Sequence, residues 1–326
     1  MQKKSVGVLL LQLGTPDEPT PSAVRRYLAE FLSDPRVVDL SRWLWLPLLH
    51  GIILRRRPPR SAALYQKIWR QDGLSPLLYF TQQQQKGVEA ALGKEVMVRF
   101  AMRYGNPSLN KVLDEMMAAG VTRLLIFPLY PQFSASTTGS ALDGVQRYFA
   151  QKRAIPTLRF AQPFYDHPLY IKALAKPINK NPTKKDKPFY LFTFHGLPQR
   201  HADEGDPYPD QCRITAEKLA KALSLPSDRW RLTFQSRFGR DPWLLPATDA
   251  ELARLPAQGH TQVVAVCPGF VSDCLETLEE IAQGGEAHFL RSGGERFHCL
   301  PCLNDNPSWL SALSQMVAAE LSGWEK

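Results

Sequence analysis

The amino-acid sequence predicts an α/β protein of two similar domains, each with a parallel sheet flanked by helices. Short apolar runs bounded by glycine and proline indicate strands that are buried on both faces. Segments with helical spacing, such as 108–119 and 210–223, alternate with these runs, and this alternation is typical of parallel sheets. The two halves of the chain also repeat short motifs in the same order, which indicates two copies of one domain plan.

Apolar runs along the whole chain supply the expected strands. In order they are VGVLLLQLG, VMVRFAMRYG, TRLLIFPLYP, FYLFTFHG, RLTFQSRFG and QVVAVCPG. The first run is short, lacks a small-residue cleavage site and ends at Pro16, so we expect a buried strand there rather than a signal peptide. The apolar stretch 43–54 is interrupted by proline, histidine and glycine and is too short to cross a bilayer.

The repeated motifs set the expected domain limits. The first half contains L-G-T-P (13–16), R-Y-G-N-P (103–107) and G-V-T-R-L-L-I-F-P (120–128). The second half contains H-G-L-P (195–198), R-F-G-R-D-P (237–242) and G-H-T-Q-V-V-A-V-C-P (259–268). The first two motifs lie further apart in the first half, which indicates an insertion of about residues 31–80. We expect one domain over 1–155, a second over 156–306 and a C-terminal helix over 307–326.

The insertion carries an apolar segment next to a basic cluster. Its apolar side chains between Trp43 and Ile53 are followed by Arg55, Arg56 and Arg57. Such a segment is suited to form a lip over a cleft and to touch an anionic membrane surface. The alternative is an ordinary helix packed on its own domain, because apolar stripes usually belong to the core.

The composition is that of a folded protein with a basic surface. The chain has 326 residues, is 44% hydrophobic and 22% charged, and carries a formal net charge of +9. This balance favours anionic partners such as acidic lipids or a carboxylate-bearing substrate, or is simply a soluble surface. No nucleic-acid motif accompanies the charge, so nucleic acid is not an expected partner. The five irregularly spaced cysteines indicate a reducing compartment, and we expect a cytoplasmic protein.

His195 is the candidate catalytic base. It ends the expected strand at 189–194 and is followed at once by Gly196 and Pro198. Ligands of parallel α/β sheets bind beyond the carboxyl ends of the strands, and an imidazole there is suited to general-base chemistry near neutral pH. The alternative is a histidine with a purely structural role.

A row of carboxylates follows the expected strand at 263–267. Asp273, Glu276 and Glu280 stand at i, i+3 and i+7, so they share one face of an α-helix that Ser272 or Asp273 would cap. Such a row can pass protons or hydrated cations, and carboxylate oxygens suit divalent iron. The alternative is that the acids only favour the N-terminus of the helix, which explains Glu280 least well.

Two further patterns argue against bound cofactors. Segment 130–140 is rich in hydroxyls but has no phosphate-loop lysine, and no G-x-G-x-x-G follows any expected strand. The pair Cys299-x-x-Cys302 lacks a second pair at matching spacing, so neither zinc nor an iron–sulfur cluster is expected there.

Nine segments together resemble ferrochelatases of the proteobacterial type, nearly from end to end. They are LLLQLGTPDEP, FLSDPRVV, QKIWRQDGLSPL, MRYGNP, FPLYPQFSASTTGS, FTFHGLP, QSRFGRDPWLLP, CPGFVSDCLETLEEI and CLNDNPSWL. The resemblance implies two Rossmann-like domains of the chelatase type, with a cleft between them and no nucleotide-binding motif. It also implies insertion of Fe2+ into protoporphyrin IX with release of two protons, which gives protohaem in the terminal step of haem biosynthesis.

By matching residues, the resemblance assigns catalysis and metal binding to His195 and Glu276. It assigns Glu280 to a path for protons or metal ions. Asp273 is assigned to the same path because it belongs to the same row of acidic residues. Segments that line the porphyrin cleft or hold its propionates contribute Tyr65, Ser75, Arg103, Tyr104, Ser136 and Thr137. The residue types at these positions fit the chemistry. Metallation needs a base that accepts the pyrrole protons, and the propionates need hydrogen-bond donors from arginine and hydroxyl groups.

The resemblance also bears on cofactors and partners. Iron is the substrate and no resident cofactor is required; one type of [2Fe–2S]-containing member has cysteine at the position of Ala135, so such a cluster is not expected. Cys274 stands where some members have histidine. Expected partners are protoporphyrin IX, ferrous iron, the inner face of the cytoplasmic membrane as a peripheral contact, and the oxidase that precedes this step.

Alternative functions remain open at this point. The chain could be a chelatase for another porphyrin or metal, such as coproporphyrin or cobalt. It could also be a non-catalytic haem or porphyrin carrier, in which His195 would serve as an axial ligand. Multiple turnover separates an enzyme from a carrier, and competition between porphyrins and between metals separates the chelatases.

Overall fold

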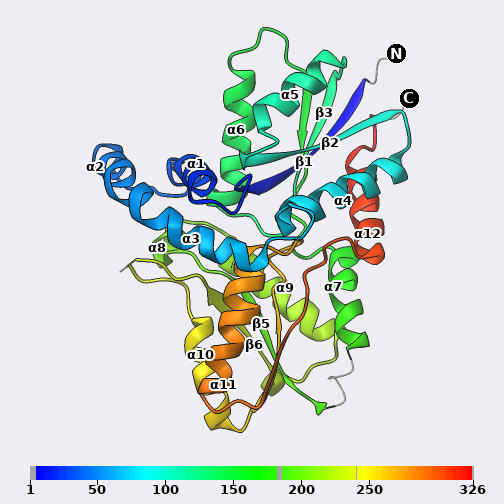
Figure 1. The fold of residues 1–326 in the computed structure, drawn as a ribbon. Coiled ribbons are helices and arrows are strands. Elements are labelled where there is room, and N and C mark those ends of the chain that lie inside the picture. The colour runs from blue at the N-terminus through cyan, green and yellow to red at the C-terminus, as the bar shows by residue number, and fades with distance from the viewer. Residues whose placement is uncertain (1–4, 182–185, 240, 325–326) are drawn as a thin grey trace. The chain divides into compact units, whose positions relative to one another are not determined.

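The computed structural model describes residues 5–181, 186–239 and 241–324, which group into two compact units (Figure 1). The N-terminal unit comprises the chain up to Tyr130, Ser134–Pro163 and the segment from Leu310 onward. The C-terminal unit comprises Pro131–Phe133 and Phe164–Trp309. The limits expected at residues 155 and 306 stay a prediction.

Each unit contains a four-stranded parallel sheet with the same strand order. The N-terminal sheet runs β2-β1-β3-β4 and the C-terminal sheet runs β6-β5-β7-β8. The first sheet consists of β1 (Val6–Thr15), β2 (Val96–Gly105), β3 (Arg123–Pro128) and β4 (Thr157–Phe160). The second consists of β5 (Phe189–His195), β6 (Trp230–Gln235), β7 (Gln262–Val266) and β8 (Arg296–Cys299). The predicted fold class and its internal repetition are therefore confirmed.

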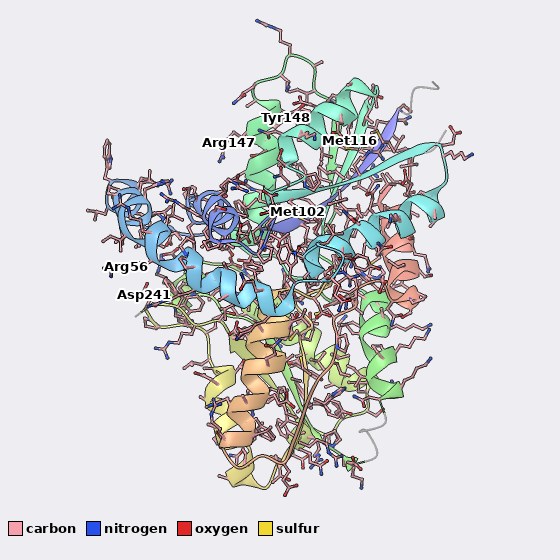
Figure 2. The ribbon with its side chains drawn as sticks, viewed as in Figure 1. Arg56, Met102, Met116, Arg147, Tyr148 and Asp241 are labelled. Atoms are coloured by element: carbon pink, nitrogen blue, oxygen red, sulfur yellow. The ribbon has the colours of Figure 1, made fainter. Side chains whose placement is uncertain are left out.

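The inner strands of the two sheets are buried because their side chains are apolar on both faces; they are β1, β3, β5 and β7. Leu10 of β1 lies opposite Phe100 of β2 and Phe127 of β3, and all three side chains are buried. Met116 and Tyr148, marked in Figure 2, come from flanking helices and join the core that covers one face of this sheet. Helices on a parallel sheet bury the faces that the strands leave apolar.

The helices of the N-terminal unit flank its sheet and form the insertion. They are α1 (Pro21–Leu32), α2 (Arg42–Leu48), η1 (Leu49–Ile53), α3 (Leu54–Ile68), α4 (Pro76–Leu92), α5 (Leu109–Ala118), η2 (Ala135–Gly139), α6 (Ser140–Phe149) and most of α12 (Pro307–Glu320). The segments η1 and η2 are π-helical.

The helices of the C-terminal unit pack on the second sheet. They are α7 (Pro168–Lys180), α8 (Gln199–Asp203), α9 (Tyr208–Ala222), η4 (Ser227–Arg229), α10 (Thr248–Arg254), η5 (Pro256–Gln258), η6 (Glu276–Gly285) and α11 (Glu286–Arg291). The core beside the last strands combines Leu191, Val263 and Phe289 with the thiol of Cys267.

The insertion has one face that packs on its own unit and one exposed face, and its role as a lip or membrane contact stays a prediction. Trp45 of α2 is buried and its indole N–H donates to the carbonyl oxygen of Leu32 at 2.7 Å, so one side of the segment packs on α1 as core. Trp43 and Leu44, by contrast, are 90% and 77% exposed. One face of the apolar segment is therefore structural and the other faces solvent.

The acidic segment after β7 differs from the expected α-helix. Its first part, η6, is a π-helix of ten residues that begins at Glu276, so Asp273 precedes the helix. The i→i+5 bonds of a π-helix shift which residues stack, and such segments are rare and frequent at functional sites. The expectation of one α-helical face capped by Ser272 or Asp273 is therefore wrong, because it assumed α-helical spacing.

Candidate active site

His195 occupies the carboxyl end of β5, opposite Gln235 at the end of β6. Its Nδ1 lies 2.7 Å from the carbonyl oxygen of Gly196. A carbonyl oxygen only accepts hydrogen bonds, so Nδ1 is the donor of this contact, and in the neutral form of the ring Nε2 then presents a lone pair. The ring is half-buried at the strand end. The local structure thus orients an imidazole as a proton acceptor.

Glu280 is held in the same region by Ser236, the residue that follows β6. The backbone N–H of Ser236 donates to Oε1 at 2.7 Å and its hydroxyl donates to Oε2 at 2.5 Å. Ser236 has φ of 64°, a left-handed conformation that is uncommon for residues with a side chain. This backbone geometry directs both donors to one carboxylate.

The pKa of Glu280 is shifted by its burial and by the other predicted residues of this unit. Burial raises the pKa of Glu280, and the negative charge of Glu276 adds to this effect. The hydrogen bonds from Ser236 lower the pKa, and so does His195 when its ring carries a positive charge, but the net shift is upward. His195 and Glu276 therefore both act electrostatically on Glu280 within the C-terminal unit.

Gln235 links the turn after His195 to the start of η6. Its carbonyl oxygen accepts from the N–H of Gly196 at 2.8 Å, and its Nε2 lies 3.4 Å from the carbonyl oxygen of Glu276. Its Oε1 accepts from the hydroxyl of Thr193 at 2.8 Å. A Cβ on Gly196 would lie 2.8 Å from the Gln235 carbonyl oxygen, so this close approach requires glycine.

Asp273 has both carboxylate oxygens engaged within the protein. Oδ2 accepts from Nδ2 of Asn304 at 2.6 Å, and Oδ1 accepts from the hydroxyl of Thr277 at 2.8 Å. Oδ1 also lies 3.3 Å from the backbone nitrogen of Cys302. This carboxylate ties the loop after β7 to the segment after β8, and its assignment to a proton or metal path stays a prediction.

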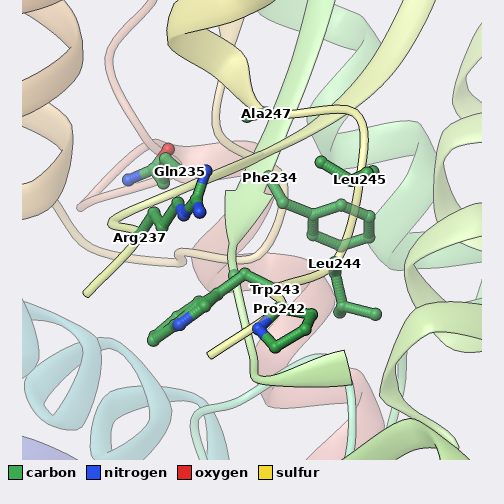
Figure 3. A pocket seen from close by; sticks show the side chains of 9 residues that line it. Phe234, Gln235, Arg237, Pro242, Trp243, Leu244, Leu245 and Ala247 are labelled. Carbon is green, nitrogen blue, oxygen red and sulfur yellow. The ribbon is translucent and has the colours of Figure 1, made fainter. Parts of the chain in front are cut away.

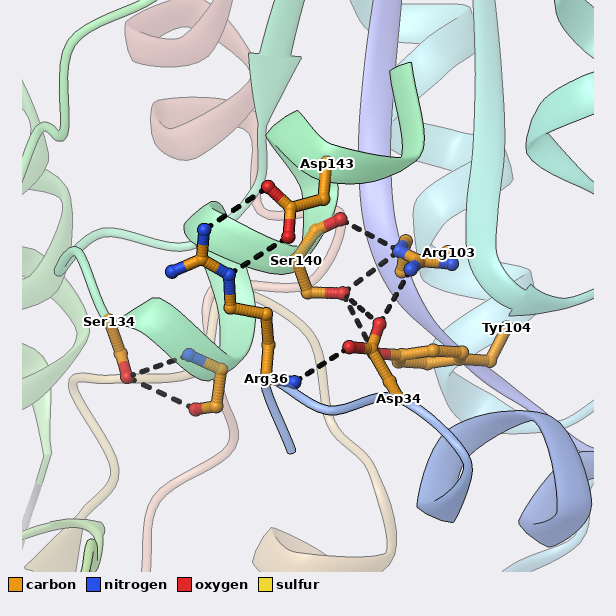
Figure 4. Close-up of polar contacts among 8 residues, drawn as sticks. Asp34, Arg36, Arg103, Tyr104, Ser134, Ser140 and Asp143 are labelled. Atoms are coloured by element: carbon orange, nitrogen blue, oxygen red, sulfur yellow. Dashed lines mark hydrogen bonds and ion pairs between the residues drawn. The ribbon is translucent and has the colours of Figure 1, made fainter. Parts of the chain in front are cut away.

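A second polar cluster lies in the N-terminal unit at the end of β2 (Figure 4). Arg103 donates through Nη2 to Oδ2 of Asp34 at 2.6 Å and through Nε to the hydroxyl of Ser140 at 2.9 Å. The hydroxyl of Tyr104 donates to the same Asp34 oxygen at 2.9 Å. Arg103 and Tyr104, which the sequence singled out, are thus brought together by two residues that it did not single out.

The segment with Ser136 and Thr137 lies beside this cluster. Both residues belong to η2, where the N–H of Ser136 donates to Oγ of Ser134 at 3.3 Å and the hydroxyl of Thr137 donates to the Ser134 carbonyl oxygen at 3.4 Å. Arg36 pairs with Asp143 through two bonds of 2.9 and 3.2 Å. The π-helical turn η2 thus contains two half-buried residues with hydroxyl groups, Ser136 and Thr137.

Tyr65 and Ser75 are both buried in the N-terminal unit. Tyr65 of α3 packs edge-on against Trp69, with ring centroids 6.1 Å apart. Ser75 caps α4, because its Oγ accepts from the N–H of Leu78 at 3.2 Å. The hydroxyl of Ser75 thus already has a structural partner, and the binding roles of both residues stay predictions.

A pocket of about 300 Å³ opens beside the turn after His195 (Figure 3). Its walls are mainly apolar, with one cationic side chain. They include Phe234, Gln235, Arg237, Trp243, Leu244 and Leu245. The pocket lies within the C-terminal unit, next to the Gly196 backbone that His195 contacts.

Comparison with known proteins decides the family of the chain. The sequence profile described as Ferrochelatase matches residues 5–321. The chain belongs to the ferrochelatase family. The ferrochelatase of Pectobacterium atrosepticum is 49% identical over 318 residues, which cover 97% of this chain and 99% of that protein. Ferrochelatase 1 of Shewanella oneidensis is 48% identical and covers 98% of this chain and 96% of that protein.

Solved structures agree on the fold of this ferrochelatase. SirB from Bacillus subtilis with Fe3+ is 11% identical, covers 98% of this chain and 97% of its own, and has a TM-score of 0.53. CbiX, described as the terminal enzyme of sirohaem biosynthesis in denitrifying bacteria, is 14% identical, covers 97% and 100%, and also has a TM-score of 0.53. These low identities establish the chelatase fold alone.

Membership of the ferrochelatase family confirms the function expected from the sequence. The enzyme is a lyase that inserts iron into protoporphyrin for haem biosynthesis. Within the described residues, none of the helices combines the length and apolarity that a bilayer-spanning segment requires.

Several residues that contact the predicted site residues or their neighbours escaped the sequence reasoning. Asp34, Ser140, Gln235 and Ser236 each lie in a segment that resembles the family, namely FLSDPRVV, FPLYPQFSASTTGS and QSRFGRDPWLLP. Their contacts are with residues 36 to 106 positions away in the chain. The motifs marked the segments, but only the fold shows which partner each side chain has.

Proposed function

We propose that this ferrochelatase deprotonates the porphyrin with His195 as the general base. The observation that carries the proposal is the imidazole whose Nδ1 is held by the Gly196 carbonyl while Nε2 is left as an acceptor. Conversion of protoporphyrin IX and Fe2+ to protohaem releases two pyrrole protons, so the site must supply a base. His195 Nε2 accepts the first of these protons and returns to the neutral form by passing it on.

Glu276 and Glu280 supply the proposed route for protons or hydrated iron. The raised pKa of Glu280, caused first by burial, brings its proton exchange closer to neutral pH, which suits a proton relay. In this proposal Glu276 is the partner of His195, and the two residues bind the iron or take up the pyrrole protons. The engaged oxygens of Asp273 favour a structural role for that carboxylate over a place in the route.

Porphyrin binding in this proposal also uses the N-terminal unit. Arg103 and Tyr104, with the hydroxyls of Ser136 and Thr137, provide cationic and hydroxyl donors suited to propionates. Tyr65 and Ser75 are assigned to the same binding surface because their segments match those of the family.

The test is anaerobic turnover with ferrous iron and protoporphyrin IX, followed by the loss of porphyrin fluorescence. The wild-type protein is expected to turn over many equivalents, whereas His195→Ala is expected to lose about 100-fold or more of the rate. His298→Ala is the matched control, because His298 is an exposed histidine of β8 in the same unit. Near-normal turnover by His195→Ala would remove His195 from the mechanism.

The same assay separates the remaining alternatives. A carrier gives at most one equivalent of product, which would contradict catalytic insertion by this chain. Parallel assays with coproporphyrin and with cobalt rank the substrates, and we expect protoporphyrin IX and iron to be preferred.

We further propose that the enzyme works without an iron–sulfur cluster. One type of cluster-containing family member has cysteine at the position of Ala135, and Cys299-x-x-Cys302 lacks a second pair at matching spacing. Purified protein is therefore expected to contain no acid-labile sulfide. Stoichiometric sulfide together with bound iron would overturn this part of the proposal.

Contact with the cytoplasmic face of the membrane is part of the same proposal. The exposed face of the insertion presents Trp43, Leu44, Leu48 and Ile52. Arg56 of α3, which is labelled in Figure 2, follows this segment in the chain. Apolar side chains next to cations suit the headgroup region of an anionic bilayer. An apolar porphyrin arriving from the preceding oxidase would reach the enzyme at this surface.

Vesicle sedimentation tests the membrane contact. Trp43→Ser combined with Leu44→Ser is expected to abolish binding to anionic vesicles and to leave the fold intact, because both side chains are exposed. Ile155→Ser is the control, since Ile155 is an exposed apolar residue outside the insertion. Unchanged vesicle binding by the double variant would contradict the proposal. Trp45 is unsuitable for this test, because it is buried.

A further inference from the structure

The predicted porphyrin residues of the N-terminal unit share one buried carboxylate. Asp34 follows α1, and its side chain is only 4% exposed. Its Oδ2 accepts from Nη2 of Arg103 at 2.6 Å, the hydroxyl of Tyr104 at 2.9 Å and the hydroxyl of Ser140 at 2.7 Å (Figure 4). Its Oδ1 accepts from the N–H of Arg36 at 2.8 Å. One carboxylate thus connects the end of β2 with the start of α6.

These contacts fix the plane of the Arg103 guanidinium. Nη2 is held by Asp34, while Nε donates to both the carbonyl oxygen and the hydroxyl of Ser140 at 2.9 Å. The guanidinium is planar and its donors form a rigid fork, so two fixed nitrogens also set the direction of Nη1. The Arg103 side chain is 12% exposed, which leaves a small accessible edge.

The charge of Asp34 is maintained by the same contacts. Burial opposes ionisation, but hydrogen bonds from Ser140, the Arg36 backbone and Tyr104, together with the Arg103 charge, lower the pKa of Asp34 overall. Loss of this charge would leave a nearly buried guanidinium without its counter-ion, which proteins tolerate poorly. Arg103 would then turn toward solvent or another acceptor.

We propose that Asp34 is a positioning residue of the porphyrin site, which orients Arg103 and Tyr104 for binding the carboxylate-bearing macrocycle. The inference rests on the proposed assignment of porphyrin binding to these two residues. Asp34 acts through them rather than on the ligand, because a carboxylate facing a propionate would repel it.

Asp34→Asn tests the inference, since it keeps the shape of the side chain and removes its charge. The dissociation constant for protoporphyrin IX without iron, measured by fluorescence, is expected to rise at least about 10-fold. The KM for iron and the kcat at saturating porphyrin are expected to change less than about twofold. Asp143→Asn is the matched control, because Asp143 pairs with Arg36 in the same region but does not contact Arg103; its porphyrin affinity should stay within about twofold of wild type.

A double-mutant cycle with Arg103→Met separates this inference from the proposed function. If Asp34 acts through Arg103, Asp34→Asn should weaken porphyrin binding far less in the Arg103→Met background than alone. Weakened binding by Arg103→Met, with Asp34→Asn within twofold of wild type, would overturn the positioning role alone. Unchanged binding by Arg103→Met would overturn the assignment of Arg103 and the inference together.

Ser140→Ala provides a second variant in case Asp34→Asn does not fold. It removes the hydroxyl that accepts from Arg103 and donates to Asp34 while leaving the charge in place. Porphyrin affinity is expected to fall about threefold to tenfold. A lowered melting temperature with unchanged porphyrin affinity in the folded protein would show a merely structural cluster and contradict the positioning role.

Discussion

Glu280 combines burial with two donated hydrogen bonds, and these act on its ionisation in opposite directions. Burial disfavours the carboxylate, whereas the two donors of Ser236 favour it. Burial prevails, so the pKa of Glu280 is raised above its ordinary value of 4.5. The residue can therefore hold a proton at a pH where an exposed glutamate has lost it, as the proposed relay requires.

The raised pKa of Glu280 predicts a pH-dependent contribution to stability. Between 4.5 and the raised pKa, the folded protein binds more protons at this site than the unfolded chain does. The free energy of unfolding contributed by Glu280 is therefore full below 4.5 and falls as the pH rises through the raised pKa. Urea unfolding of wild type and Glu280→Gln over a pH series is expected to show a difference that changes across this window. A difference independent of pH would contradict the raised pKa.

Individual site residues were predictable from the sequence only where a strand end or a motif marked them. His195 stands at the end of a recognisable apolar run, and Glu280 belongs to an acidic row. Asp34 has no such mark, because its partners Arg103 and Ser140 lie 69 and 106 positions away. A carboxylate that acts through side chains so distant in the sequence becomes recognisable only when the sheet brings them together.

At the scale of elements, the ends of β1 and β2 approach each other unusually closely. Gly14 of β1 has φ of 127°, and a Cβ there would lie 1.9 Å from the carbonyl oxygen of Tyr104. The register places these two residues side by side. The geometry of the Tyr104 end of β2 therefore depends on the absence of a side chain at position 14.

Gly14→Ala is accordingly expected to lower the free energy of unfolding by about 3 kcal/mol or more, because it adds a clash with backbone to an unfavourable φ. Gly73→Ala is the control, since Gly73 also has a positive φ, of 80°, but no atom lies within 4 Å of its added Cβ. This control should cost about 1 kcal/mol. Chemical denaturation measures both, and equal losses would show that the close approach at Gly14 is relieved by backbone movement.

The sequence predicted the six longer strands but missed the two shortest, β4 and β8, and the π-helices. The four-residue strands β4 and β8 are short and partly exposed, so they lack the continuous apolar run that marks a buried strand. The π-helical form of η6 was missed because acidic and apolar spacing is judged against the α-helical period. The sequence alone therefore could not predict elements whose backbone structure depends on tertiary packing rather than on a local residue pattern.

At the scale of the whole molecule, the exposed apolar surface is strongly uneven. Among the described residues, nine large apolar side chains are exposed, and five of them fall between residues 40 and 52. They are Leu40, Trp43, Leu44, Leu48 and Ile52. Single exposed apolar residues need no explanation, but a cluster on one segment indicates an interaction surface. The sequence identified this stretch as an apolar segment next to basic residues, but it did not show which of its side chains would be exposed.

The proposed membrane contact predicts a dependence on lipid charge, because basic residues lie beside this segment. Arg55 and Arg56 are exposed and directly follow the apolar segment. Each cation near an anionic surface contributes about 1 kcal/mol, so Arg55→Gln with Arg56→Gln should weaken binding to phosphatidylserine vesicles roughly 30-fold at low salt. Binding to neutral vesicles should be nearly unchanged, and added salt should shrink the difference because it screens the charges. Lys172→Gln with Lys176→Gln removes the same charge from exposed positions of α7 and should have little effect. Equal weakening by both pairs of substitutions would mean that the net charge of +9, rather than the place of these arginines, draws the enzyme to the membrane.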